Sequence, residues 1–306
     1  MIVTLAGGVG AARFLEGLIR VIPQRELTVI GNVGDDMEVY GLHVSPDLDI
    51  VTYTLAGIVD PTRGWGIRDD TFSFLSAMRT YGCETWFNIG DRDLATHIFR
   101  TEQLRNGRSL SSVTASIVNR LGLRFRLLPA TDDDFQTHVI CNGKRMHFQE
   151  YMVKTQTKPR VQRILFQGTT SSKPAHGVLQ SIRGARGIII CPSNPIVSIG
   201  AILNVPRIRP ALNRTESKIV AISPIVRGKT IKGPADKLMR ALGVEPTALG
   251  IAQMYRDFLD TLILDKQDKQ LAKKVEDLGI RAIVTNTIMR TIADKVGLAR
   301  IAIREL

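Results

Sequence analysis

The sequence predicts an α/β fold, Rossmann-like, with a mostly parallel three-layer sheet. Short apolar runs typical of buried strands alternate along the chain with segments whose apolar residues recur at helical spacing. Three of these runs, at residues 2–6, 27–30 and 187–191, lead directly into turns rich in glycine, aspartate, serine or asparagine. Because ligands bind outside the carboxyl ends of strands in open parallel sheets, we expect these turns to lie side by side.

Composition and charge exclude several classes of protein. Hydrophobic residues at 44% and charged residues at 23% are typical of a globular chain, and no apolar stretch is long enough for a membrane span. The net charge of +12 is spread along the chain, and aromatic residues are only 6%, so a basic cleft for an anionic ligand is favoured over nucleic-acid binding. Three scattered cysteines without metal-ligand spacing predict a reducing, cytoplasmic setting and no structural zinc.

The first element is a strand that runs into a glycine turn and then a helix. Glycine lets a backbone approach a phosphate closely, and a helix N-terminus offers unpaired N–H groups. We therefore predict that Gly7, Gly8, Val9 and Gly10 bind the phosphates of a nucleotide. The alternative is a turn that binds nothing. No P-loop Gly-Lys-Ser/Thr follows, and Phe14 replaces the third glycine of the dinucleotide fingerprint.

The turn after the second strand adds carboxylates. Asp35 and Asp36 stand in this turn, and Asp47 and Asp49 follow within fifteen residues. Since hard oxygen ligands suit Mg²⁺, we predict a magnesium ion bound by Asp35, Asp36 and Asp49. Asp49 is also the predicted catalytic carboxylate, facing an attacking hydroxyl. A pair of aspartates that only stabilises the turn is the alternative interpretation of Asp35 and Asp36.

Residues 58–121 are interpreted as a helical insertion in the sheet. Within this insertion, residues 85–90 are typical of a short extended piece that ends at Asp91 and Asp93. These two carboxylates either cap the helix that follows them or face a ligand.

An antiparallel annex is predicted at about residues 135–168. The Asn142-Gly143 pair is the strongest hairpin signal in the chain. This annex serves either as a cap over the cleft or as the surface of a homodimer. Residues 260–302 are expected to run as strand, helix, strand, helix and final strand. Because no linker or internal repeat divides the chain, residues 1–306 are interpreted as one α/β domain.

Polar and basic loops follow two further buried strands. The loop Ser193-Asn194-Pro195 is rigid and is suited to a base, a ribose or a phosphate, although Asn-Pro is also a common turn opener. The loop after residues 218–224 carries three cations that either bind phosphates or remain solvated: Arg227, Lys229 and Lys232.

Five stretches of the chain, in this order and at this spacing, resemble the 2-phospho-L-lactate transferases of coenzyme F-420 biosynthesis. They are residues 5–14, 31–36, 46–57, 90–93 and 191–195. The resemblance implies transfer of a 2-phospholactyl group from lactyl-2-diphospho-5'-guanosine to the ribityl hydroxyl of 7,8-didemethyl-8-hydroxy-5-deazariboflavin. GMP would leave, Mg²⁺ would be the cofactor and coenzyme F-420-0 the product. The sequence does not distinguish three possible transferred acids: lactate, the enol form derived from phosphoenolpyruvate, and glycerate.

The resemblance also implies which residues contact the two substrates. The glycine turn, with Ser193, Asn194 and Pro195, would hold the guanosine nucleotide. Deazaflavin would contact Asp49, Asn88 and Asp91. A related group of gluconeogenesis factors has a similar glycine turn, and a regulatory protein that binds nucleotide-sugars is therefore the alternative function. The segments at residues 46–49 and 90–93 favour the transferase.

Overall fold

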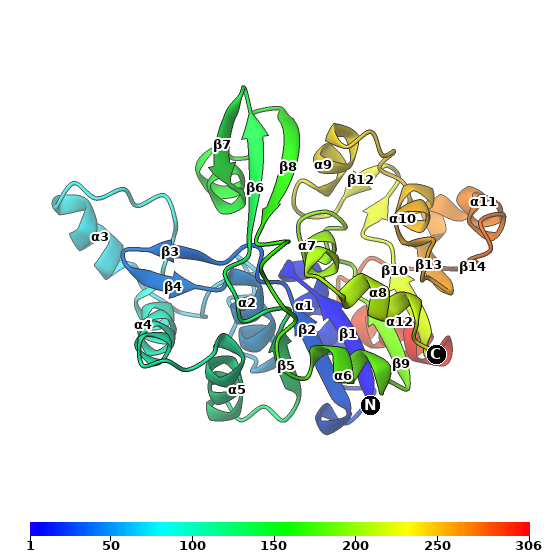
Figure 1. Ribbon diagram of the computed structural model, residues 1–306, viewed down its shortest axis with the longest axis horizontal. Helices are drawn as coiled ribbons and strands as arrows, with labels where there is room; N and C mark the ends of the chain where they lie inside the picture. Colours follow the sequence, from blue (N-terminus) through cyan, green and yellow to red (C-terminus); the bar gives the residue numbers. More distant parts are fainter.

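Seven parallel strands form the centre of the molecule in the computed structural model, which describes residues 1–306 (Figure 1). Their order across the sheet is β14 (Arg281–Thr285), β13 (Thr261–Asp265), β10 (Lys218–Ile222), β9 (Gly187–Ile190), β1 (Ile2–Ala6), β2 (Leu27–Gly31) and β5 (Arg126–Pro129). Every neighbouring pair of strands is parallel. The predicted fold class is therefore confirmed.

Three adjacent strands of this sheet, β9, β1 and β2, are entirely buried. Every residue of β1, β2 and β9 is buried, and because helices cover both faces these strands are continuous apolar runs. Their register aligns their carboxyl ends: Ala6 lies opposite Gly31, and Leu5 lies opposite Ile190. The turns that follow these strands consequently begin at the same edge of the sheet, as the sequence predicted.

Helices flank the sheet (Figure 1). They are α1 (Gly8–Leu18), α2 (Pro46–Leu55), α6 (Val178–Arg183), α7 (Ile199–Asn204), α8 (Ile208–Asn213), α10 (Ala248–Tyr255), α11 (Ala272–Glu276) and α12 (Ile292–Arg304). Helix α9 (Ala235–Ala241) instead packs against the annex strand β8 (Val161–Gln167). Helix α1 packs against both α2 and α12. At Gly17 the approach of α12 is so close that a Cβ would lie 2.4 Å from the backbone of Lys295. Any side chain at this position would force the two helices apart.

The helical insertion contains α3 (Ser73–Thr80), α4 (Asp91–Arg105) and α5 (Leu110–Arg120), seen at the left of Figure 1. It follows a small hairpin of β3 (Met37–Val39) and β4 (Leu42–Val44). The extended piece predicted at residues 85–90 is wrong, because this segment is an irregular loop. It has no neighbouring strand, and an extended segment without a partner cannot form a ladder of hydrogen bonds.

The annex is a three-stranded antiparallel sheet that projects away from the central sheet (Figure 1). Strand β6 (Gln136–Cys141) lies between β7 (Lys144–His147) and β8 (Val161–Gln167). The predicted hairpin turn has φ values of 51° at Asn142 and 73° at Gly143, the left-handed conformation that a two-residue turn requires. A second two-stranded hairpin, β11 (Ile225–Val226) with β12 (Lys229–Thr230), lies across from the annex.

The C-terminal part ends in a helix. The final strand predicted before residue 302 is wrong, since α12 continues to Arg304. A reciprocal capping box of Thr291 and Asp294 starts this helix, and its buried residues face α1. One hydrophobic cluster runs from Ile2 to Ala302 and includes residues of the annex. No helix of the structure combines the length and the apolar character that crossing a membrane requires.

Candidate active site

A cavity of about 1010 Å³ lies at the carboxyl ends of the central strands. Its walls come from the turns after β1, β2, β9 and β10, from α2 and α4, from the annex, and from the loop after β14. Pockets for one small ligand have volumes of roughly 300–1,000 Å³. This cavity is therefore large enough for two ligands to lie beside each other.

The glycine turn forms one wall of the cavity. Helix α1 begins at Gly8, whose φ of +72° favours glycine, and Gly7 immediately precedes the helix. A Cβ on Gly7 would lie 2.6 Å from Asp47 Oδ2 and 2.7 Å from Ser198 Cβ. The turn is thus packed on one side, while Gly7, Gly8, Val9 and Gly10 all line the cavity on the other. The first N–H groups of α1 can meet an anion there.

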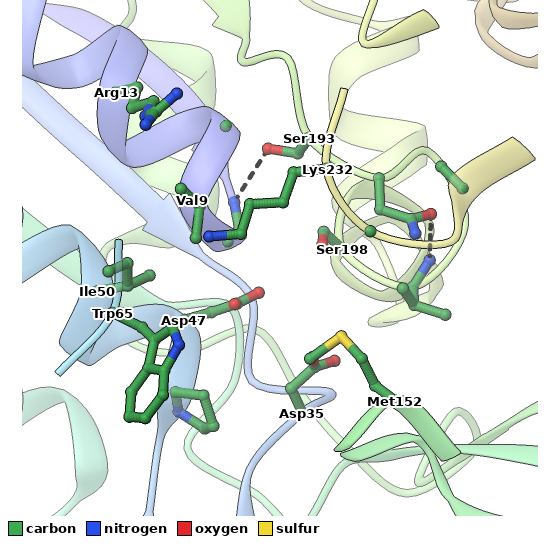
Figure 2. A pocket seen from close by; sticks show the side chains of 18 of the residues that line it. Val9, Arg13, Asp35, Asp47, Ile50, Trp65, Met152, Ser193, Ser198 and Lys232 are labelled. Atoms are coloured by element: carbon green, nitrogen blue, oxygen red, sulfur yellow. Dashed lines mark hydrogen bonds between the residues drawn. The ribbon is translucent and has the colours of Figure 1, made fainter. Parts of the chain in front are cut away.

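The loop after β9 is fastened to this turn. The Gly7 N–H donates to Ser193 Oγ over 3.2 Å, as Figure 2 shows. Asn194 Oδ1 accepts from the N–H groups of Ile196 and Val197, so this oxygen stabilises its own loop. Ser193 and Asn194 line the cavity, and Pro195 lies outside the set of lining residues.

Two buried carboxylates, Asp35 and Asp47, converge at the floor of the cavity (Figure 2). Asn32 Nδ2 donates to both of them, over 3.2 Å to Asp35 Oδ1 and 2.9 Å to Asp47 Oδ2. Burial and the charge of Asp47 raise the pKa of Asp35 well above its usual value. Burial raises the pKa of Asp47 to about 6. Two carboxylates that repel each other and face a cavity fit a divalent cation with oxygen ligands.

The other two predicted metal ligands, Asp36 and Asp49, interact with other side chains. Asp36 Oδ2 accepts a hydrogen bond from Ser45 over 2.7 Å and lies 3.0 Å from His43 Nε2, and Asp36 does not line the cavity. Asp49 does line it but forms an ion pair with the buried Arg100. No group of three or more His, Cys, Asp or Glu side chains is placed to hold a metal ion. The structure therefore does not bring Asp35, Asp36 and Asp49 together, and Asp47 takes the place beside Asp35.

A buried polar network surrounds Asp49. Its members lie on α2 and α4: Asp49, Tyr53, Asp93, His97 and Arg100. The Tyr53 hydroxyl donates to Asp93 Oδ1 over 2.7 Å, and His97 Nε2 lies 3.4 Å from the same oxygen. Burial opposes ionisation of Asp93, but the adjacent His97 and the hydrogen bond from Tyr53 outweigh it, so the pKa of Asp93 lies below its usual value. Of this network, sequence reasoning identified Asp49 and Asp93 as candidate site residues.

A helical signal for the missed residues was present in the sequence. Asp93 and His97 are four residues apart, and His97 and Arg100 are three apart, a spacing that places them on one face of a helix. They are nevertheless in a segment with mostly polar residues, and a buried face cannot be recognised there from hydropathy.

The remaining predicted residues divide between the cavity and the scaffold. Asn88 lines the cavity. Asp91 does not: its carboxylate accepts from the N–H groups of Ser73 and Phe74 and so caps α3. Lys232 lines the cavity, extends toward Val9 and donates to the Arg63 carbonyl over 3.1 Å (Figure 2).

The other two cations of this loop, Arg227 and Lys229, lie outside the lining residues. A further cation, Arg13 on α1, lines the cavity near Lys232. Burial and the charge of Arg13 lower the pKa of Lys232. Two cations that repel each other beside the N-terminus of α1 make this end of the cavity suited to an anionic ligand.

Known proteins resemble the chain over nearly its whole length. The sequence model of a family described as 2-phospho-L-lactate transferase CofD matches residues 2–296. A phosphoenolpyruvate transferase of Streptomyces griseus is 44% identical over 308 residues, which cover 99% of this chain and 97% of the relative. A 2-phospho-L-lactate transferase of Methanosarcina mazei is 36% identical over 302 residues, which cover 99% of each chain.

A solved structure shares the fold. A UPF0052 family protein of Bacillus halodurans superposes with a TM-score of 0.67 over 99% of this chain and 98% of that protein, at 16% sequence identity. At this identity the likeness bears on the fold alone.

Proposed function

The chain belongs to the CofD family of 2-phospho-L-lactate transferases, and from this premise we propose that it transfers a phosphorylated three-carbon acid from a guanosine-diphosphate-linked donor to a deazaflavin. The observation that carries the proposal is the single large cavity, because it joins an anion-binding end to a carboxylate end. The reaction needs both ends, since an anionic diphosphate must lie beside a neutral hydroxyl that attacks it.

The nucleotide of the donor is assigned to the glycine turn. The N–H groups at the start of α1, together with Arg13 and Lys232, offer positive potential to its phosphates. Asn194 uses its Oδ1 within its own loop, so its Nδ2 is the group left to donate to the nucleotide. The phosphates of the bound nucleotide would thus lie next to the loop after β9, which the Gly7–Ser193 hydrogen bond connects to the glycine turn.

Asp35 and Asp47 are assigned to Mg²⁺. They line the cavity, share the amide of Asn32 and repel each other, which a cation would relieve. When bound, the ion would offset the negative charge that develops on the transferred phosphate and on the departing GMP. Asn32 orients both carboxylates and is itself fixed by donating to the Val197 carbonyl.

The acceptor is assigned to the end of the cavity lined by Asp49 and Asn88. Asp49 orients the ribityl hydroxyl and accepts its proton as the hydroxyl oxygen attacks phosphorus. The new O–P bond forms while the P–O bond to GMP breaks, and the electron pair of that bond stays on the GMP phosphate. Apolar side chains of the annex, among them Phe148 and Met152, line the cavity and can cover the flat deazaflavin ring.

The transferred acid has two candidates. The family description favours lactate. The name of the Streptomyces griseus relative, which shares 44% of its residues with this chain, favours the enolpyruvyl form. The two acids differ in oxidation state and in the geometry of one carbon, so a direct comparison of donors separates them.

The test is a transfer assay with deazaflavin, Mg²⁺ and the lactyl, enolpyruvyl or glyceryl donor in parallel, each product being identified by its mass. One deazaflavin product that forms with release of GMP is the expected result, and its mass names the acid. If no donor gives a product while calorimetry shows tight binding of a UDP-sugar, the transferase proposal fails and the regulatory alternative stands.

A further inference from the structure

The two oxygens of the Asp49 carboxylate have different surroundings. One oxygen, Oδ1, pairs with Nη2 of Arg100, while the other, Oδ2, is buried without any hydrogen-bond partner. Asp49 is only 5% exposed and yet lines the cavity. A buried carboxylate oxygen without a donor costs free energy, and a hydrogen bond from a bound ligand would recover that cost.

A neighbouring histidine, His97, cannot donate a hydrogen bond to this free oxygen. His97 Nδ1 lies 3.8 Å from Asp49 Oδ2. Arg100 Nη1 lies 3.2 Å from the same ring nitrogen, and because a guanidinium can only donate, Nδ1 must be the acceptor. The hydrogen of the neutral ring is then on Nε2, which faces Asp93. His97 therefore has no hydrogen to give to Asp49.

Arg100 brings about both of these features without touching the cavity. It is 1% exposed, lies outside the lining residues, and contacts Asp49, His97 and the carbonyl of His43. Its planar fork can bond to the carboxylate and the imidazole at once, which the single ammonium of a lysine cannot do in the same geometry.

We propose that Arg100 is a positioning residue for the acceptor: by holding Asp49 Oδ1 and fixing the tautomer of His97, it reserves Asp49 Oδ2 for a hydrogen bond from a substrate hydroxyl. The identity of that hydroxyl as the ribityl group of deazaflavin rests on the proposed function. The reservation of the oxygen rests on the geometry alone.

Arg100→Lys tests the proposal because it retains the buried charge and removes the fork. We expect turnover of deazaflavin to fall about 10- to 100-fold, the cost of a misplaced reacting group, while the KM of the donor stays within about twofold. Arg105→Lys is the matched control, because Arg105 lies on the same helix but is exposed and donates to the Gly41 carbonyl. Its activity should equal that of the wild type.

A double-mutant cycle separates positioning from folding. If Arg100 acts through Asp49, then Arg100→Lys should cause little further loss in an Asp49→Asn background. Additive losses would overturn the proposal, as would full turnover in Arg100→Lys. Thermal unfolding of each variant shows whether it folds, and an unfolded Asp49→Asn would be replaced by Asp49→Ser.

The tautomer of His97 can be determined in the protein without any substrate. In ¹⁵N NMR, with His97→Gln assigning the signals, the wild type should carry its hydrogen on Nε2, and Arg100→Lys should shift this equilibrium toward Nδ1. An Nδ1-protonated ring in the wild type would overturn the inference. A wild type that gives no product with any donor but carries the Nε2 hydrogen would contradict only the proposed function.

Discussion

Asp47 is a carboxylate that is both buried and next to a second carboxylate, and both conditions oppose its ionisation when no cation is bound. It is buried against the glycine turn, where any Cβ on Gly7 would collide with it, and it lies beside the second buried carboxylate, Asp35. Its pKa of about 6 is above that of an unfolded chain. The folded protein therefore binds a proton here more tightly than the unfolded one, and its stability falls as pH rises from about 4 through 6.

We expect Asp47→Asn to reduce this pH dependence, of which Asp35 keeps its own part. At pH 8 and without metal, the variant should be more stable than the wild type by on the order of 1–3 kcal/mol, because an amide takes the place of an ionised buried carboxylate. Mg²⁺ should raise the Tm of the wild type at pH 8 more than at pH 5, and should leave the variant unchanged. Urea unfolding and thermal melts measure both effects. A wild-type stability that rises with pH over this range would contradict the assignment.

Residues that line the cavity were predictable where they follow a buried strand directly. The glycine turn, Asp35 and Ser193 do so, because strand ends meet at one edge of a parallel sheet. Arg100 and His97 could not be predicted in this way, because they contact Asp49 only after α4 has packed beside α2. Side chains brought together by two helices leave no local pattern in the sequence.

At the scale of elements, the annex is tied to the floor of the site. Gln149, which is 2% exposed and follows β7, donates from Nε2 to Asp35 Oδ2 over 2.8 Å. His147 Nε2 lies 3.1 Å from the carbonyl oxygen of Asp36. These contacts hold the annex over the cavity, where Phe148 and Met152 form part of the lining.

We expect Gln149→Leu to loosen this connection. Asp35 would lose a donor while remaining buried, and the free energy of unfolding at pH 8 should fall by about 1–3 kcal/mol. The loss should be smaller at low pH, where Asp35 is protonated. Gln162→Leu is the control, because Gln162 is on the exposed side of the annex and accepts only from the Gly143 N–H. Equal losses of unfolding free energy in the two variants would show that the hydrogen bond from Gln149 to Asp35 contributes no more to stability than the exposed one made by Gln162.

Helices and strands were predicted best where the pattern of apolar and polar residues was regular or a turn signal was present. The hairpin at Asn142-Gly143 and the buried strands β1, β2, β9 and β10 were found from pattern alone. Two strands were predicted wrongly, at residues 85–90 and near residue 302. In both places apolar residues are present, but only tertiary structure decides whether a partner strand is available.

At the scale of the whole molecule, the cavity is lined by residues from Gly7 to Arg290. A ligand there contacts the first and last parts of the chain at once. Binding should therefore stabilise the entire fold rather than one portion of it, in agreement with a single hydrophobic cluster that extends from Ile2 to Ala302.

We expect GDP, at about 100 times its Kd, to add about 2.7 kcal/mol of stability and to raise the Tm by roughly 5 °C in one transition. Differential scanning calorimetry measures this. Gly8→Val is the control: a valine is strained at φ +72° and obstructs the approach of phosphates, so the variant should show a much smaller shift. Two transitions, of which GDP moved only one, would contradict a single cooperative fold.

The place of β1 in the sheet has a consequence for how the chain is made. β1 leaves the ribosome well before β9, yet β9 is one of its two neighbours in the sheet, and Ile2 pairs with Gly187. At a synthesis rate of 5–20 residues per second, the edge of β1 that faces β9 waits roughly 10–40 s for its partner. During that interval the nascent chain presents an unpaired apolar strand. Exposed apolar strand edges of this kind are prone to aggregation until they are paired.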